Sequence, residues 1–163
     1  MKKLYIDFDG VIMSTNDGIN NLLYENNIDI NSYNERIAFL KNVEWDLLLK
    51  KSTEISNAFN NLEILRNSNL FELAILTHVC SDKEAEEKRK LIFEKIGDIE
   101  VISVPRHHEK CDFVDPTNAI LVDDYTKNLE LWEKNGGISI KFTNKKYSKF
   151  KSTYNLLELL DFI

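Results

Sequence analysis

Residues 4–11, Leu-Tyr-Ile-Asp-Phe-Asp-Gly-Val, decide how the rest of the chain is interpreted. A short apolar run leads into Asp7 and Asp9, a pattern that predicts a buried strand followed by a turn. Four more apolar runs of strand length follow, at residues 72–76, 99–104, 118–122 and 138–142. The two aspartates therefore stand at the end of the first predicted strand, where ligands bind in open α/β sheets.

Helical patterns separate these strands. One helix is predicted to begin at Ser81 or Asp82 and to end before Gly97, and residues 126–134 form another. Residues 152–162, which are rich in leucine, are expected to form a terminal helix. Strands that alternate with helices indicate an α/β fold, in which a parallel sheet is covered on both faces.

Residues 14–69 interrupt this alternation because they contain no good strand and no proline. Their helical patterns lie near residues 17–26, 34–50 and 52–67. We therefore predict a Rossmann-like parallel-sheet core, made of residues 1–13 and 70–163. A small helical cap, residues 14–69, is inserted in this core after the first strand.

Composition narrows the class of protein. The chain has 163 residues, 43% of them hydrophobic, and a formal charge of −6, which suits one globular domain with a small insertion. The acidic balance argues against binding to polymeric nucleic acid, and no apolar run approaches the ~20 residues of a membrane span. Cys80 and Cys111 are not spaced as a CxxC pair. We expect a cytoplasmic protein that is not bound to a membrane; the sequence leaves its oligomeric state open.

Polar side chains follow four of the predicted strands. In chain order they are Asp7, Asp9, Thr77, Lys110, Asp123 and Asp124. Parallel strands bring their carboxyl ends to one edge, so these groups should converge. Crowded carboxylates repel one another unless a cation lies among them, and hard oxygen ligands favour Mg²⁺. One carboxylate could then attack phosphorus, while Thr77 and Lys110 hold the phosphoryl oxygens.

These residues resemble the motifs of the haloacid dehalogenase (HAD) superfamily. The segment Asp7-Phe8-Asp9-Gly10-Val11 resembles its motif I, Thr77 its motif II, Lys110 its motif III and Asp123-Asp124 its motif IV. The small cap after motif I and the segment 120–137 are most similar to the 5′(3′)-deoxyribonucleotidase group. The resemblance covers the whole predicted core.

The resemblance implies a Mg²⁺-dependent phosphomonoesterase that acts on a small phosphorylated substrate, with nucleoside monophosphates suspected. Asp7 is the implied nucleophile, which forms an aspartyl-phosphate, and Asp9 is the general acid and base. The residues expected to bind the phosphate are Gly10, Thr77, His78 and Lys110. Mg²⁺ is expected at the Asp7 side chain, the Asp9 backbone carbonyl and the motif IV carboxylates. Whether Asp123 or Asp124 binds the metal directly is open.

Alternatives remain at this stage. Lys83, Lys88 and Arg89 lie near enough to be alternatives to Lys110. A HAD phosphotransferase, or a phosphatase for another small metabolite, would use the same residues. A receiver-like signalling module is disfavoured because the Thr77 hydroxyl comes early in the chain and the acidic pair Asp123-Asp124 comes last. A non-catalytic protein is disfavoured because Asp7, Asp9, Thr77 and Asp123 are all present. The cap aromatics are expected to form mainly its core, with one or two available to stack on a base: Tyr24, Phe39, Trp45 and Phe59.

Overall fold

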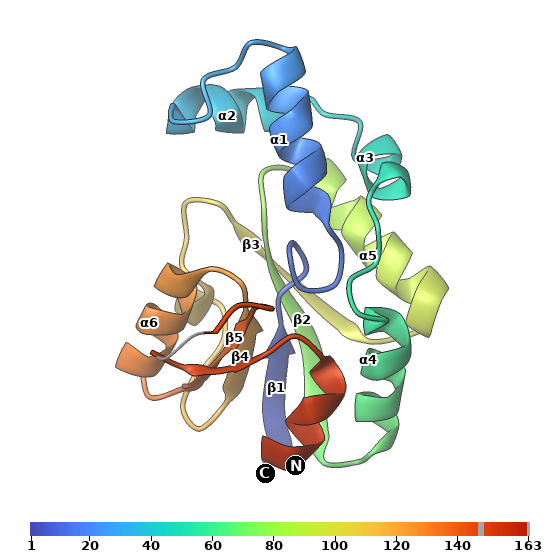
Figure 1. The fold of residues 1–163 in the computed structure, drawn as a ribbon, viewed down its shortest axis with the longest axis vertical. Coiled ribbons are helices and arrows are strands. Elements are labelled where there is room, and N and C mark those ends of the chain that lie inside the picture. Colours follow the sequence, from blue (N-terminus) through green and yellow to red (C-terminus); the bar gives the residue numbers. More distant parts are fainter. Residues whose placement is uncertain (147–148, 163) are drawn as a thin grey trace.

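A six-stranded parallel sheet forms the centre of the protein in the computed structural model, which describes residues 1–146 and 149–162 (Figure 1). The strands are β1 (Lys2–Ile6), β2 (Phe71–Val79), β3 (Glu100–Pro105), β4 (Ile120–Asp123), β5 (Ile138–Phe142) and β6 (Lys151–Thr153). Their order across the sheet is β3-β2-β1-β4-β5-β6, and every neighbouring pair is parallel. The predicted α/β fold with a Rossmann-like parallel sheet is confirmed.

Helices connect the strands. They are α1 (Thr15–Glu25), α2 (Tyr33–Leu40), α3 (Trp45–Lys51), α4 (Ala58–Asn67), α5 (Asp82–Ile96) and α6 (Thr126–Lys134), with short 3-10 helices η1 (Lys110–Asp112) and η2 (Leu156–Phe162). Helix α5 begins as predicted, because the Ser81 hydroxyl accepts a hydrogen bond from the Glu84 amide. It ends at Gly97, whose φ of 75° suits glycine. No helix in the described ranges is long and apolar enough to cross a bilayer.

The sheet is buried on both faces because side chains of each strand alternate between them. Leu4 and Ile6 of β1 point into the larger hydrophobic cluster, which α4, α5 and η2 complete. Tyr5 points into the other cluster, where it meets the edge of the Trp132 ring of α6. The Trp132 indole donates to the Ala119 carbonyl (3.0 Å), so α6 is fixed beside the start of β4.

The C-terminal segment differs from the predicted helix over residues 152–162. Residues 151–153 instead add a sixth strand beside β5, and the helical part that follows is the 3-10 helix η2. The β-branched Thr153 is buried at the end of this strand, and its hydroxyl hydrogen-bonds with the Asn155 carbonyl. That local bond favours a turn over a helix at this point.

Two predicted helices of residues 14–69 also differ. The pattern over 34–50 divides into α2 and α3, because the Trp45 indole donates to the Leu40 carbonyl (3.2 Å) and ends α2. Helix α4 begins only at residue 58, since Ser56 and Asn57 adopt left-handed backbone conformations.

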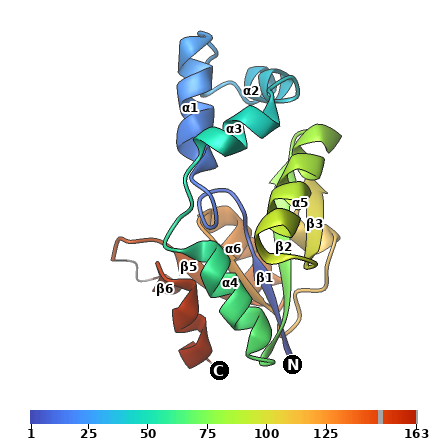
Figure 2. The same cartoon turned by 90° about the vertical axis from the view of Figure 1, so that its right-hand side faces the viewer.

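The packing of α4 bears on the predicted boundary between core and cap. Residues of α1, α2 and α3 form a second hydrophobic cluster, to which the core contributes only Cys80 among its buried members; these helices lie above the carboxyl edge of the sheet (Figures 1 and 2). The buried side chains of α4 belong instead to the cluster of the sheet, and Figure 2 shows α4 beside the C-terminal helix. The division remains a proposal, and we propose that the cap ends before α4.

A substitution in α4 tests this packing. Leu62→Ala removes a fully buried side chain of the main cluster, so we expect the free energy of unfolding to fall by about 2–5 kcal/mol. Ile64→Ala in the same helix is the control, since Ile64 is 40% exposed, and should cost less than about 1 kcal/mol. Urea denaturation measures both. Equal losses would contradict the assignment of α4 to the core.

Candidate active site

The site lies where the strand order reverses. The chain runs from β1 outward through β2 to β3 and then returns to β4 on the other side of β1. Such a reversal opens a crevice at the carboxyl ends of the strands. Asp7 follows β1 directly, and its amide donates to the Val122 carbonyl of β4 (2.9 Å). Asp123, the last residue of β4, therefore lies beside Asp7.

The turn after β1 is built around Gly10. The Phe8 carbonyl accepts three backbone hydrogen bonds from this turn, and Gly10 has a φ of 79°. A Cβ on Gly10 would lie 2.1 Å from Asp124 Oδ2 and 2.8 Å from Asn16 Nδ2, so a side chain has no room. The Gly10 amide already donates to Met13 O. The structure thus gives Gly10 a spacing role, and its predicted contact with phosphate stays a prediction.

Three carboxylates gather at this edge. Oxygens of Asp7, Asp123 and Asp124 all lie within 4.8 Å of one another. Burial raises the pKa of Asp7 to about 8, with Lys110 opposing this shift and Asp123 adding to it. Burial and the charge of Asp123 raise the pKa of Asp124 to about 7.

This repulsion is what a cation would relieve, so the group fits a divalent metal. Because all the donors are oxygens, Mg²⁺ suits the group. The Asp9 side chain is outside this group, and its predicted contribution through a backbone carbonyl stays a prediction.

Asp123 and Asp124 differ in their surroundings. Asp123 is fully buried, and it accepts hydrogen bonds from Lys110 Nζ (2.7 Å), Asn128 Nδ2 (2.8 Å) and the Tyr125 amide (2.7 Å). Asp124 lines the cavity described below, and the hydrogen bond that it accepts from Asn16 is longer, at 3.3 Å. Asp124 is therefore the more available of the two for a direct metal contact.

Lys110 contacts both Asp7, the predicted nucleophile, and Asp123 of the predicted motif IV. Its side chain is 2% exposed, and Nζ lies 2.9 Å from Asp7 Oδ1 and 2.7 Å from Asp123 Oδ2. The cost of burial lowers the pKa of Lys110, but the two aspartates outweigh it and the pKa is raised. Lys110 is therefore a fixed positive charge beneath the carboxylates.

Lys88 is a second buried lysine at the site. Its Nζ lies 2.5 Å from Asp9 Oδ2, 2.7 Å from Glu84 Oε1 and 3.1 Å from Thr77 Oγ1. Burial acts to raise the pKa of Asp9, but the charge and hydrogen bond of Lys88, with a hydrogen bond from Thr15, hold it below its ordinary value. The Thr77 hydroxyl is fully buried against Lys88, so its predicted contact with phosphate stays a prediction.

The sequence treats Lys88 only as an alternative to Lys110, whereas the structure buries both. Lys88 lies on the same face of α5 as the buried residues Ala85, Ile92 and Ile96. The sequence signal that could have predicted the burial of Lys88 is its position within the apolar stripe of this helix. The other two alternatives lie elsewhere: Lys83 is largely exposed, and Arg89 is exposed as well.

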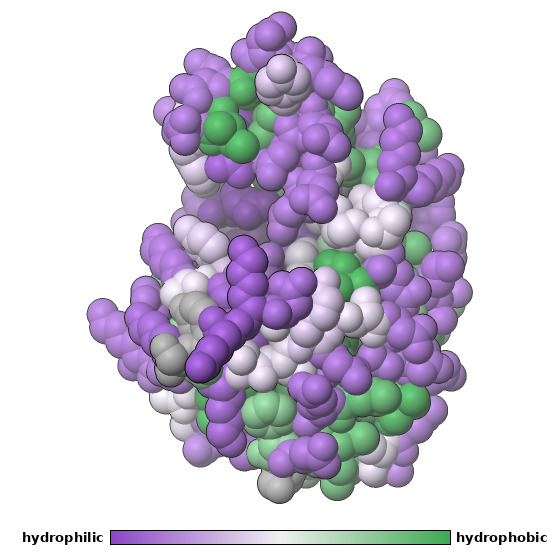
Figure 3. Space-filling view, viewed as in Figure 1, coloured by the Kyte–Doolittle hydropathy of each residue, from purple (hydrophilic) through white to green (hydrophobic). Residues whose placement is uncertain are grey.

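A cavity of about 550 Å³ opens above the carboxylates, between the cap and the core. Figure 3 shows a hollow at this position. Its lining includes three acidic residues of the core, four residues of α2 in the cap, and a loop after β3: Asp7, Asp9, Asp124, Tyr33, Arg36, Ile37, Leu40, Arg106, His107 and His108. None of the cap aromatics singled out from the sequence lines it, and Tyr24, one of them, is 85% exposed.

His78 lies in the wall of this cavity, as its predicted contact with substrate requires. Its Nε2 lies 2.9 Å from the His108 carbonyl oxygen, so the neutral ring donates there. Burial and the nearby charge of Lys110 lower the pKa of His78 to about 4. His78 is therefore neutral at physiological pH.

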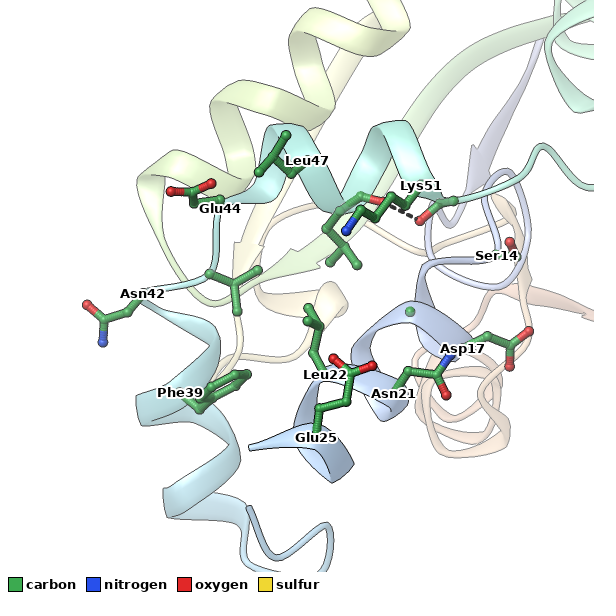
Figure 4. A pocket seen from close by; sticks show the side chains of 14 residues that line it. Ser14, Asp17, Asn21, Leu22, Glu25, Phe39, Asn42, Glu44, Leu47 and Lys51 are labelled. Carbon is green, nitrogen blue, oxygen red and sulfur yellow. Dashed lines mark hydrogen bonds between the residues drawn. The ribbon is translucent and has the colours of Figure 1, made fainter. Parts of the chain in front are cut away.

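A second pocket, of about 590 Å³, lies inside the cap (Figure 4). Leu22, Phe39, Leu47 and other side chains from α1 and α3 and the segment before α3 line it. It contains none of the residues that the motifs predict, so the cavity above Asp7 is the candidate active site.

Several site residues have no motif in the sequence. Asn16 and Asn128 hydrogen-bond to Asp124 and Asp123, and Glu84 accepts from the Cys80 amide (2.7 Å) beside Lys88. A polar residue at the start of a helix is ordinarily a cap or a solvated side chain. The contact between Asn16 and Asp124 joins residues 108 positions apart in the chain, whereas the other two contacts are local.

The buried ion pair predicts a large effect of removing Lys88. Lys88→Met leaves Asp9 and Glu84 without their partner in a buried position, so the free energy of unfolding should fall by about 3–5 kcal/mol. Lys83→Met removes a lysine whose side chain is 58% exposed and should change stability by less than about 1 kcal/mol. Chemical denaturation of both variants measures this. A Lys88 variant as stable as the Lys83 variant would contradict the assigned pairing.

The raised pKa values predict that Mg²⁺ binding depends on pH. Without metal, Asp7 and Asp124 lose their protons only near pH 8 and pH 7, whereas a metal ion needs them ionised. Mg²⁺ affinity should therefore rise between about pH 6 and pH 9, with protons released on binding near pH 7 and fewer above pH 9. Calorimetry in buffers of different ionisation enthalpy measures the release. An affinity that is constant over this range would contradict the shifts.

The fold matches solved structures, although no protein-family model and no curated protein matches the chain. A HAD-superfamily hydrolase of subfamily IA from Geobacter sulfurreducens is 13% identical with a TM-score of 0.69, and 100% of both chains is covered. A HAD phosphatase from Thermococcus onnurineus is 14% identical with a TM-score of 0.65, with 99% of this chain and 97% of that chain covered. The D,D-heptose 1.7-bisphosphate phosphatase from B. bronchiseptica is 12% identical with a TM-score of 0.58, and both chains are covered fully. The chain therefore has the fold of the HAD-superfamily hydrolases.

Proposed function

We propose that the protein is a Mg²⁺-dependent phosphomonoesterase that acts through an aspartyl-phosphate at Asp7. The observation that carries this proposal is the position of Asp7. It lies in the floor of the cavity, within the three-carboxylate group and 2.9 Å from Lys110 Nζ. A carboxylate between a cation site and a buried ammonium can be kept ionised, and it can receive a phosphoryl group whose charge the same cations stabilise.

Mg²⁺ would be held by Asp7, Asp124 and Asp123, and when bound it would supply positive charge for the ionised carboxylates and for the phosphate oxygens. The residues of the chain itself would position the carboxylates and limit the access of water. Lys110 fixes Asp7 and Asp123 relative to each other through its two short contacts. The cap and the core together reduce the access of bulk water to the cavity between them.

Asp9 is proposed to carry the protons. As an Asp7 oxygen bonds to phosphorus and the ester P–O bond breaks, the leaving oxygen takes a proton from Asp9. Water then attacks phosphorus and gives its proton to Asp9, while the bond from phosphorus to Asp7 breaks. Thr15 and Lys88 each hold one Asp9 oxygen at 2.5 Å. Lys88 favours the ionised form of Asp9, which is the form that activates water. The proton that Asp9 takes from this water restores its protonated form, which serves the next leaving oxygen.

Nucleoside monophosphates are the substrates that we propose first. The cavity volume of about 550 Å³ is within the range of small-molecule sites. Tyr33 from α2 and Tyr125 before α6 line it and are 53% and 58% exposed. An exposed tyrosine ring offers a face on which a base can stack.

The solved structures of the same fold support the general chemistry. One of them is named a HAD phosphatase. The heptose bisphosphate phosphatase is described as a complex with magnesium and phosphate. These names belong to proteins that are 12–14% identical to this chain, so they support a phosphatase without selecting its substrate.

Replacing the nucleophile tests the mechanism. With Mg²⁺ and an aryl phosphate, Asp7→Asn should lower kcat by at least about 10³-fold, because no covalent intermediate forms. Asp17→Asn removes an exposed carboxylate of α1 and should retain activity. In the wild-type protein, mass spectrometry after acid quenching should find phosphate on Asp7. Equal activity of the wild-type and Asp7→Asn proteins would refute the mechanism.

A further inference from the structure

Two arginines face the cavity from opposite sides. Arg36 belongs to α2 in the cap, and Arg106 follows β3 in the core. Neither residue belongs to a motif that the sequence analysis used. The Nε atom of each is buried, and no hydrogen-bond partner for it is found among the described residues. A buried donor without a partner costs free energy, so each guanidinium has binding capacity that the protein itself does not use.

The two lysines at the site form ion pairs, whereas Arg36, Arg106 and Asp124 form none among the described residues. Lys88 and Lys110 pair with Asp9, Asp7 and Asp123 at 2.9 Å or less. The ion pairs found among residues 1–146 and 149–162 include neither arginine. Arg106 hydrogen-bonds to the Cys80 side chain, and the charges of Asp9 and Glu84 also act on it. A thiol fixes the arginine without neutralising it.

Arg36 belongs to a different part of the protein from the reacting phosphoryl group at Asp7. Asp7 lies at the carboxyl edge of the sheet, whereas α2 lies above that edge in the cap (Figure 1). Lys110 and a metal held by the carboxylates already serve the phosphoryl group at Asp7. A cation on the cap is better placed for another part of the substrate.

We propose that Arg36 and Arg106 together bind a second oxyanion of the substrate, either a phosphate or a carboxylate. This inference rests on the proposed phosphomonoesterase activity. It replaces the nucleoside monophosphates proposed first with phosphomonoesters that carry a second anionic group; among nucleotides, a nucleoside bisphosphate meets this requirement. The planar fork of arginine suits the paired oxygens of phosphate and carboxylate. Because one arginine comes from the cap and the other from the core, the second anion would also link the two parts.

Binding to a protein that cannot turn over tests the proposal. In the Asp7→Asn background with Mg²⁺, calorimetry compares adenosine 5′-monophosphate with adenosine 3′,5′-bisphosphate, and ethyl phosphate with phosphoglycolate. The doubly anionic member of at least one pair should bind at least about tenfold more tightly, since hydrogen bonds to charged groups contribute this much. The pair with the larger ratio identifies the second group as phosphate or carboxylate.

The variants then assign the preference to the arginines. Arg36→Gln and Arg106→Gln should each bring the affinity ratio within a pair close to one. Arg89→Gln, an exposed arginine of α5 outside the cavity, should leave the ratio unchanged. Because Arg106 packs on Cys80, Arg106→Lys serves as a second variant that keeps the charge. It should retain part of the preference.

A wild-type ratio near one in both pairs would overturn the proposal. An unchanged ratio in both glutamine variants would also overturn it, because the arginines would then act on the reacting phosphoryl group or on nothing. These outcomes are separate from a failure of the proposed function. A protein that prefers doubly anionic ligands but never hydrolyses an aryl phosphate would retain the anion site and lose the phosphatase assignment.

Discussion

The crowding of four aspartates at the carboxyl edge of the sheet is the constraint on which the rest of the site depends. Asp7, Asp9 and Asp123 are buried, and Asp124 lines the cavity beside them. Such a group is stable only if cations lie within it. Lys88 and Lys110 supply two fixed charges through ion pairs of 2.9 Å or less, which leaves a deficit that suits one divalent ion. The two lysines pair with different aspartates, since Lys110 contacts Asp7 and Asp123 whereas Lys88 contacts Asp9.

The two parts of the protein contribute different things to the cavity. The core supplies groups that are held rigidly, because strands β1 and β4 are packed on both faces and the turn after β1 permits only glycine at position 10. The cap supplies side chains from α2, including Tyr33 and Arg36, that line the cavity. In the proposed function, the core therefore carries the chemistry and the cap contributes to the choice of substrate. The proposed anion site joins them, since it draws one arginine from each.

Much of the fold could be predicted from local patterns. The run over 138–142 is β5 in the structure, and residues 126–134 are α6, as predicted. Strand β2 was expected to stop at Thr77, but it continues to Val79 because its pairing with β3 continues there. Strand β6 was missed, because a three-residue strand has too little pattern to detect without its neighbour β5. The break between α2 and α3 was missed because it depends on the Trp45 indole finding the Leu40 carbonyl.

The amino-acid sequence by itself determined the α/β class and the position of the aspartates at the strand ends. It also determined that the sheet is parallel, which follows from the alternation of strands and helices. These depend on hydrophobic periodicity and on residue types at fixed positions, both of which are local. Only the tertiary structure decided that Lys88 pairs with Asp9, that α4 packs with the sheet, and that Arg36 and Arg106 share a cavity. Each of these joins residues distant in the chain, and burial changes the charge state or pairing that a side chain would have in water. From the sequence alone, a lysine is expected to lie on the solvated surface. Its ion-pair partners are known only from the tertiary structure, in which the side chain is buried away from water.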